Sequence, residues 1–189
     1  LVEVHLEDDA LAIDNHRWLA VNAKEHVEVL LVDGEPSGER FGSETDYLRV
    51  ALAPESSSGT WKSAIHPQVV RESEFLEMDL SRFDCVIFCN VGQFTENEGR
   101  VAEDYLRRGG SVVWFLGDQV ESQSYNRVLY RDGKGIFPVQ LGSRVGDAQA
   151  RQSIVLFDPR DYAHPIIQPF RGAASGGLLT TKVFEYVHA

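Results

Sequence analysis

Polar side chains that could do chemistry directly follow three apolar runs of this 189-residue sequence. In an open parallel sheet, ligands usually sit outside the carboxyl ends of the strands, so residues at these ends could line a shallow polar cleft. Turns use the same residue types, because Asp satisfies backbone groups and Gly allows positive φ, and this is the simpler interpretation. The candidate ligand-binding residues are Asp33, Gly34, Asn90, Gly92, Gln93, Gly117, Asp118 and Gln119.

Asp118 occupies a position where many α/β enzymes carry a nucleophile, a serine or cysteine on a sharp turn after a strand. An aspartate could act there as a nucleophile or a general acid, but either role needs a partner and a perturbed environment. No Asp-x-Asp pair or metal-ligand spacing accompanies it. The sequence therefore favours an Asp118 side chain that caps the next helix or turn.

The cysteines and histidines add little further chemistry. Cys85 and Cys89 lie about 13 Å apart in one strand, and a disulfide needs Cα atoms about 4.4–6.8 Å apart, so we expect two buried thiols. Cys89 would be reactive only if a helix N-terminus or a histidine lowered its pKa. The histidines, among them His66 and His164, show neither a triad context nor metal-ligand spacing, and the stretch 158–165 indicates Asx turns. The glycines at 172–177 lack the lysine of a phosphate loop, so no metal and no cofactor is expected.

Composition excludes several classes of partner. Apolar residues make up 43% of the chain, enough for a core, and the formal charge is −11. With no basic stripe to offset this charge, nucleic acid is not expected as a partner, and anionic membrane surfaces are disfavoured. No apolar run approaches about 20 residues, so this piece is not expected to insert into a membrane. Because the chain starts inside a patterned segment without Met, we interpret it as a piece of a longer protein.

The elements expected around the candidate site are those of an α/β fold. Apolar runs predict buried, mutually parallel strands at 27–32, 85–89 and 111–116, and Pro67 places a further strand at a sheet edge. Ser43 and Thr95 are expected to cap amphipathic helices. The first helix is expected to have Tyr47, Leu48, Ala51 and Leu52 on its apolar face, and the second to have a capping box to Glu98. A shorter helix is expected at 124–130, a strand at 152–158, a glycine-rich loop at 171–179 and a closing strand near 181–189. Residues 1–24 alternate as two strands, and a boundary is expected near Lys24.

These residues resemble a known fold family. The stretches "HVEVLLVDGE", "FDCVIFCNVGQFTENEGRVAEDYLRRGGSVVWFLGDQV", "YNRVLYRDGKGIFPVQLG" and "DYAHPII" look like the class I glutamine amidotransferase-like fold. More narrowly, they resemble its non-catalytic branch in large membrane-anchored bacterial proteins, which often carry a von Willebrand factor type A domain and a β-sandwich. The resemblance covers residues 25–189 and implies a flavodoxin-like, mostly parallel sheet flanked by helices. Residues 1–24 resemble the terminal strands of the preceding β-sandwich domain.

The resemblance also implies what this domain does. True amidotransferases place a cysteine at the position aligned with Asp118 and use a late His-x-Glu pair, and this chain has neither. We therefore expect a non-enzymatic interaction or ligand-sensing module, with other domains of the parent protein or envelope proteins as partners and a small polar ligand as a further candidate. The parent would hold it as a soluble domain on either side of the membrane. The alternatives are a divergent hydrolase that uses Cys89 or Asp118 and a purely architectural spacer.

Overall fold

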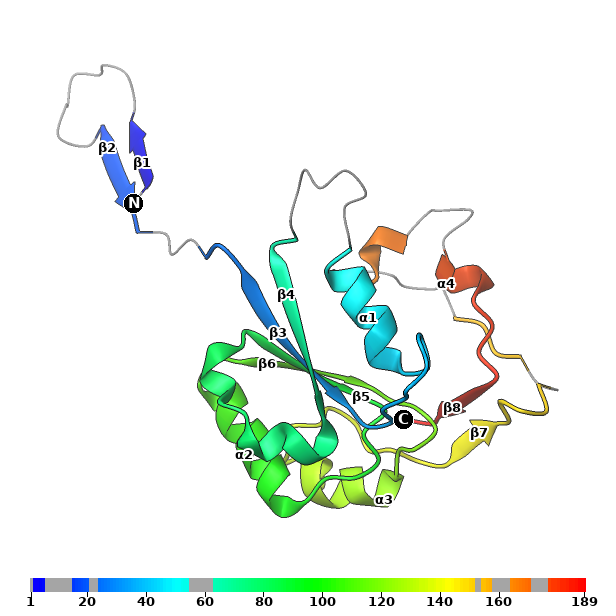
Figure 1. Ribbon diagram of the computed structural model, residues 1–189. Coiled ribbons are helices and arrows are strands. Elements are labelled where there is room, and N and C mark those ends of the chain that lie inside the picture. The colour runs from blue at the N-terminus through cyan, green and yellow to red at the C-terminus, as the bar shows by residue number, and fades with distance from the viewer. Residues whose placement is uncertain are drawn as a thin grey trace.

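A parallel sheet of four strands forms the centre of the structure. This computed structural model describes residues 2–5, 15–20, 24–54, 63–151, 154–157, 164–170 and 177–189. The strands β3 (Val27–Asp33), β4 (Ile65–Arg71), β5 (Cys85–Cys89) and β6 (Ser111–Phe115) follow the order β4-β3-β5-β6 (Figure 1). All their pairings are parallel, as predicted, and β4 with Pro67 lies at the edge as predicted. The predicted burial holds for most of β3 and for β5, but it is wrong for β6, which forms the other edge of the sheet and leaves Val113 and Phe115 exposed.

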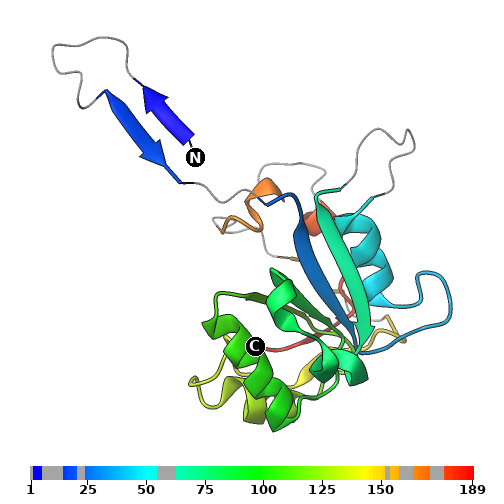
Figure 2. The same cartoon turned by 60° about the vertical axis from the view of Figure 1, so that its left-hand side comes forward.

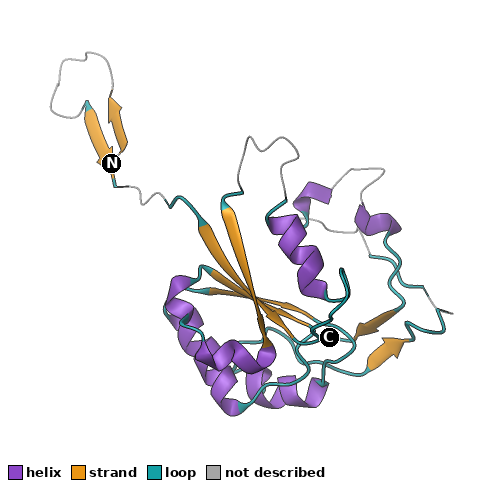
Figure 3. Cartoon of the chain, in the orientation of Figure 1, coloured by secondary structure: helices purple, strands orange, loops and turns teal. Residues whose placement is uncertain are grey.

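One face of the sheet carries the larger part of the core. It packs against α2 (Glu96–Arg107), α3 (Ser122–Tyr125), the π-helix Asn126–Tyr130 and the 3₁₀ turns Glu72–Glu77 and Leu80–Arg82 (Figure 3). Aromatic rings in this layer pack edge to face. The ring centroids of Phe88 and Phe94, for example, lie 5.0 Å apart. The fully buried side chains of this layer include Leu30, Val32, Phe75, Val86, Phe88, Tyr125 and Leu129.

Helix α2 begins and ends where the sequence predicts. The Glu98 N–H donates to the Thr95 hydroxyl over 3.3 Å, and the Glu98 carboxylate accepts from the Thr95 N–H over 2.7 Å, which is the predicted capping box. Beyond its last turn Gly109 has a φ of 93° and donates to the Leu106 carbonyl, so the helix stops there.

Helix α1 (Glu44–Leu52) covers the opposite face of the sheet, over β3 and β4. Two predictions about it are wrong. Ser43 precedes the helix, but its hydroxyl pairs with the Thr45 hydroxyl at 2.9 Å and makes no cap. Tyr47, expected on the buried face, is 61% exposed, because the sheet is contacted by Leu48 and Leu52, one residue further round the helix.

The N-terminal residues form a separate strand pair. Strand β1 (Val2–His5) pairs antiparallel with β2 (His16–Leu19), and the pair projects away from the parallel sheet (Figure 2). Its apolar side chains, Val2, Val4, Trp18 and Leu19, are all 47–64% exposed. A two-stranded ribbon with no buried face has little stability of its own.

The C-terminal part is only partly described. Strand β7 (Arg144–Gly146) pairs antiparallel with β8 (Glu185–Val187), which confirms a closing strand. The strand expected at 152–158 appears, among the described residues 154–157, only as a single bridge from Val155 to Val183. A 3₁₀ turn spans Gln168–Phe170. Of the glycine-rich loop expected at 171–179, residues 171–176 lie outside the described residues, and residues 177–179 belong to the short helix α4 (Gly177–Thr180), so the expected loop is wrong there. Of the stretch 158–165 expected to form Asx turns, residues 158–163 also lie outside the described residues.

Candidate functional site

Asn90 is the centre of the polar cluster at the carboxyl ends of β3, β5 and β6. It directly follows β5, is fully buried and has a φ of 51°, in the left-handed region that Asn adopts more readily than most residues. Its backbone N–H donates to the Phe115 carbonyl over 2.9 Å and so continues the pairing of β5 with β6. The Asn90 side chain lies where the carboxyl ends of β3, β5 and β6 meet.

The Asn90 side-chain amide is oriented by its own hydrogen bonds. Its carbonyl oxygen accepts from the backbone N–H of Gln119 over 2.9 Å. This contact fixes which end of the amide is the oxygen, because a backbone N–H can only donate. The NH₂ group then faces three carboxylates, with Nδ2 3.0 Å from Glu35 Oε2, 3.0 Å from Glu44 Oε1 and 2.8 Å from Asp118 Oδ1.

The three carboxylates come from three different segments. Glu35 lies in the turn after β3, Glu44 begins α1, and Asp118 lies in the turn after β6. One oxygen of each lies within 4.8 Å of the others, a set that could hold a metal ion. Carboxylate oxygens are the ligands that hard cations such as Ca²⁺ and Mg²⁺ take, and their remaining positions would be filled by water or ligand.

Electrostatics in this carboxylate cluster favour a proton or a cation. The pKa of Glu35 is raised by partial desolvation, by the neighbouring charge of Asp118 and by that of Glu44, against a hydrogen bond to the Gln119 side chain that lowers it. Like charges this close disfavour the fully ionised state. A positive group placed among them would remove that repulsion.

Two glycines at the strand ends are required by the close approach of Asn90. A Cβ on Gly117 would lie 2.3 Å from Asn90 Oδ1, and a Cβ on Gly34 would lie 2.2 Å from the Asn90 carbonyl oxygen. Neither has the positive φ that a simple turn glycine would show. These glycines therefore make room for the buried amide, which is a different role from the turn chemistry expected from the sequence.

Asp33 forms hydrogen bonds to two of the segments that carry the carboxylates. It is buried at the end of β3, where Oδ2 accepts from the Thr45 hydroxyl over 2.7 Å and Oδ1 from the Glu35 N–H over 3.1 Å. The first bond ties the strand end to α1, and the second fixes the turn that presents Glu35. Asp33 thus positions two of the carboxylate-bearing segments.

The structure separates the remaining candidates from this cluster. Gly92 accepts a hydrogen bond from the Glu121 N–H over 2.8 Å through its carbonyl, and Gln93 is exposed and makes no hydrogen bond among the described residues. Asp118 is exposed and receives the Asn90 amide, and no backbone N–H donates to its carboxylate in the described chain, so the expected cap is wrong. Of the eight candidates, Gly117, Asp118 and Gln119 contact the Asn90 side-chain amide, Gly34 lies against the Asn90 backbone, and Asp33 acts through Glu35 and Thr45.

A hollow adjoins the carboxylate cluster on the side of the β7–β8 pair. It has a volume of about 540 Å³, reaches Gly117 and Asp118 at one end, and has an apolar wall that includes Phe184 and Val187. Arg144 lies on its border and donates to the Asp118 carbonyl over 2.5 Å while it pairs with Glu185 over 3.1 Å. Of the three carboxylates only Asp118 lines this hollow, so Asp118 connects the hollow with the cluster.

The thiols are poor nucleophiles. Cys89 is fully buried, and desolvation together with the charges of Asp33 and Glu44 raises the pKa of its thiol to about 12. Desolvation and Asp84 also raise the pKa of Cys85. Both cysteines are free, as the strand spacing predicted, but the expectation of two buried thiols holds only for Cys89, because Cys85 is half-buried. His66 stacks on His26 with ring centroids 4.0 Å apart at the other end of β4, away from the carboxylate cluster.

Sequence reasoning missed two of the three carboxylates. Glu35 stands next to the candidate pair Asp33-Gly34, but it was assigned to no role because it follows the turn. Glu44 sits in the first turn of α1, where an acidic residue is already explained by the helix dipole. Only the meeting of α1 with two strand ends shows that they face Asp118.

Comparisons of this chain with protein-family models, with curated proteins and with solved structures find no match.

Proposed function

We propose that this domain is a non-enzymatic binding module that senses or holds a ligand bearing a positive charge. The ligand's charged group, a divalent metal ion or a protonated amine, sits among Glu35, Glu44 and Asp118. Its remainder extends into the hollow that ends at Gly117 and Asp118.

One observation carries this proposal. The Asn90 NH₂ group has two hydrogens, yet three carboxylate oxygens lie within 3.0 Å of it. The Gln119 side chain gives Glu35 a further hydrogen bond, but all of these donors are neutral, and among the described residues no ion pair involves any of the three carboxylates. Their like charges therefore repel one another without a compensating positive charge. A cation bound among them would supply that charge.

Catalysis is disfavoured by the same geometry. Acyl transfer from glutamine needs an activated thiolate or hydroxyl, but the position after β6 holds Asp118, which accepts from Asn90. The Cys89 thiol, with a pKa of about 12 and no exposed surface, is neither ionised nor reachable near neutral pH. A divergent hydrolase therefore has no favoured nucleophile here.

The wider setting of the domain is proposed from the resemblance alone. The parallel sheet with helices on both faces is consistent with the class I glutamine amidotransferase-like fold. We place the domain in its non-catalytic branch, within a larger membrane-anchored bacterial envelope protein that carries a von Willebrand factor type A domain. Residues 1–24 would then be the last strands of a preceding β-sandwich domain. Among the described residues, no helix combines the length and the apolar character needed to cross a bilayer.

Calorimetric titration of the purified chain tests the binding function. The probes are CaCl₂, MgCl₂, MnCl₂ and, separately, butylamine hydrochloride, so that metal and amine ligands are distinguished. We expect saturable binding of one of them, weakened at least tenfold in Glu35→Gln and in Asp118→Asn, because each substitution removes a carboxylate charge. Glu77→Gln, an exposed glutamate without a hydrogen bond in the described residues, is the matched control.

Two results would overturn the proposal. One is the absence of saturable heat with every probe while the chain remains folded by circular dichroism. The other is turnover of glutamine or of generic ester and amide substrates well above background that disappears in Cys89→Ala or Asp118→Asn. The second result would establish the hydrolase instead.

A further inference from the structure

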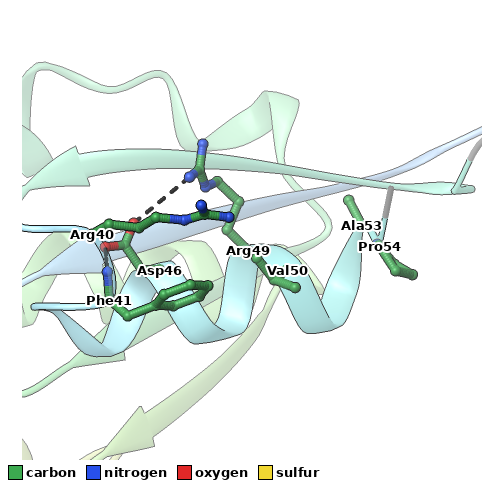
Figure 4. Close-up of a pocket in the computed structure, with 7 residues that line it drawn as sticks. All are labelled: Arg40, Phe41, Asp46, Arg49, Val50, Ala53 and Pro54. Atoms are coloured by element: carbon green, nitrogen blue, oxygen red, sulfur yellow. Dashed lines mark hydrogen bonds and ion pairs between the residues drawn. The ribbon is translucent and has the colours of Figure 1, made fainter. Parts of the chain in front are cut away.

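A second recognition surface lies on the outer side of α1, away from the carboxylate cluster. It is a pocket of about 420 Å³ whose lining side chains run from the loop before the helix to its last turn (Figure 4). We call it the arginine–aromatic patch and define it by Arg40, Phe41, Tyr47, Arg49 and Val50. Nothing in the proposed binding function uses these residues.

The backbone conformation at Phe41 leaves the aromatic side chains of the patch partly exposed. Phe41 has a φ of 60°, a conformation that costs a non-glycine residue free energy, and its N–H donates to Asp46 Oδ2 over 3.0 Å. Its ring remains 38% exposed and packs on Tyr47, itself 61% exposed, with centroids 5.1 Å apart. Val50, 47% exposed, lies on the next turn of α1.

The charges of the patch are not balanced. The Arg40 guanidinium lies over the Phe41 ring, 5.2 Å from its centroid, and makes no ion pair within the described residues. Arg49 lies 3.7 Å from Asp46 Oδ1, and the same carboxylate accepts the Phe41 N–H, so one carboxylate stands against the two arginines of the patch. The patch thus carries an excess positive charge on a chain whose formal charge is −11.

We propose that the arginine–aromatic patch docks an acidic, extended peptide segment of a partner protein. Arginines beside exposed aromatic rings are the residue types that dominate protein interfaces, and guanidinium groups bind carboxylates with paired hydrogen bonds. The net negative charge of the chain disfavours unspecific contact with an acidic partner, so binding at this patch depends on its two arginines. Two isolated arginines form no track for a nucleic acid backbone.

The length of the pocket sets the length of the occupant. Its lining residues extend beside α1, whose nine residues rise about 13 Å, and an extended peptide covers that distance with about four residues. A carboxylate of the peptide binds between Arg40 and Arg49. An apolar side chain two residues away then packs against Phe41 and Val50.

Fluorescence polarisation with a defined probe tests this docking site. The probe is a fluorescein-labelled eight-residue peptide that repeats two glutamates followed by two leucines, so that a leucine lies two residues after each glutamate, and its matched control carries glutamine in place of each glutamate. We expect the acidic probe to bind the whole chain, with affinity reduced about tenfold by Arg40→Gln and by Arg49→Gln and reduced at high salt. Arg127→Gln, an exposed arginine with no ion pair among the described residues, should leave binding unchanged.

Three results would overturn the proposal. Equal binding of the glutamate and glutamine probes would show that charge does not select the occupant. No binding of the acidic probe up to about 1 mM by a folded chain would show that the patch holds no such peptide. Concentration-dependent self-association in sedimentation that Arg40→Gln abolishes would identify a second copy of the chain as the occupant.

Discussion

Replacing Asn90 by Asp tests whether a single amide holds the carboxylate cluster together. The substitution keeps the shape of the side chain and the oxygen that accepts from the Gln119 N–H. It removes both hydrogens of the NH₂ group and places a fourth carboxylate within about 3 Å of Glu35, Glu44 and Asp118. Packing hardly changes, so the effect is electrostatic.

The expected loss in the free energy of unfolding is large compared with the stability of a typical domain. A hydrogen bond to a charged group contributes about 1.5–3 kcal/mol, and the two hydrogens of Asn90 can make two such bonds. Their loss alone lowers the free energy of unfolding by about 3–6 kcal/mol, out of the roughly 5–15 kcal/mol that domains have. Repulsion from the new carboxylate adds to this loss near neutral pH.

The loss should depend on pH with a definite sign. The neighbouring carboxylates raise the folded-state pKa of the introduced Asp above its unfolded value of about 3.9. The destabilisation is therefore complete above the folded-state pKa and disappears as the pH falls toward about 4, where a protonated acid again donates a hydrogen bond.

Urea unfolding of the wild type and of Asn90→Asp, followed by circular dichroism at pH 7 and near pH 4, measures this difference. Each comparison is made at one pH, so general acid effects on the chain cancel. A variant within about 1 kcal/mol of the wild type at pH 7, or a deficit that stays the same at both pH values, would refute the arrangement described around Asn90.

Three further predictions concern the same region. Glu35→Gln should raise the melting temperature at pH 7 but not below about pH 4, because a raised folded-state pKa means that the ionised form opposes folding above it; a lower melting temperature at pH 7 would contradict this. Gly117→Ala should cost about 1–3 kcal/mol in urea unfolding, because its Cβ would lie 2.3 Å from Asn90 Oδ1, whereas Gly38→Ala, with no atom within 4 Å, should be neutral; equal effects would argue against close packing. In a Cys85→Ala background, Cys89 should resist iodoacetamide at pH 8 until urea unfolds the chain, and rapid labelling of the folded form would argue against burial and a thiol pKa of about 12.

The elements of the fold were predictable where local signals agree with the tertiary environment. The strand Cys85–Cys89 is apolar throughout because both faces of the sheet are covered at β5, so the sequence and the structure give the same bounds. Helix α2 has a capping box, an apolar face and a glycine after its last turn, and each of these features acts within one helical turn.

The sequence-based predictions are wrong where contacts with residues distant in the sequence determine the position of a side chain. Ser43 can cap a helix, but the Thr45 hydroxyl takes its hydroxyl as a partner because Thr45 is itself bonded to Asp33 on another element. Tyr47 fits the apolar period of α1, yet the helix turns Leu48 and Leu52 to the sheet and leaves the tyrosine outside. A periodic pattern fixes an apolar stripe only to within about one residue.

The carboxylate cluster connects stability with function. Glu35, Glu44 and Asp118 are brought together by the positions of three segments, and their negative charges repel one another. They therefore stabilise the fold less than packed apolar side chains in the same place would. A ligand that binds only the folded chain stabilises it by RT ln(1 + [L]/Kd), about 2.7 kcal/mol at a hundredfold excess over Kd. A cation held by the three carboxylates would therefore raise the stability of the wild type. Removing one carboxylate should do two opposite things at once: raise the melting temperature without ligand and abolish the gain with it.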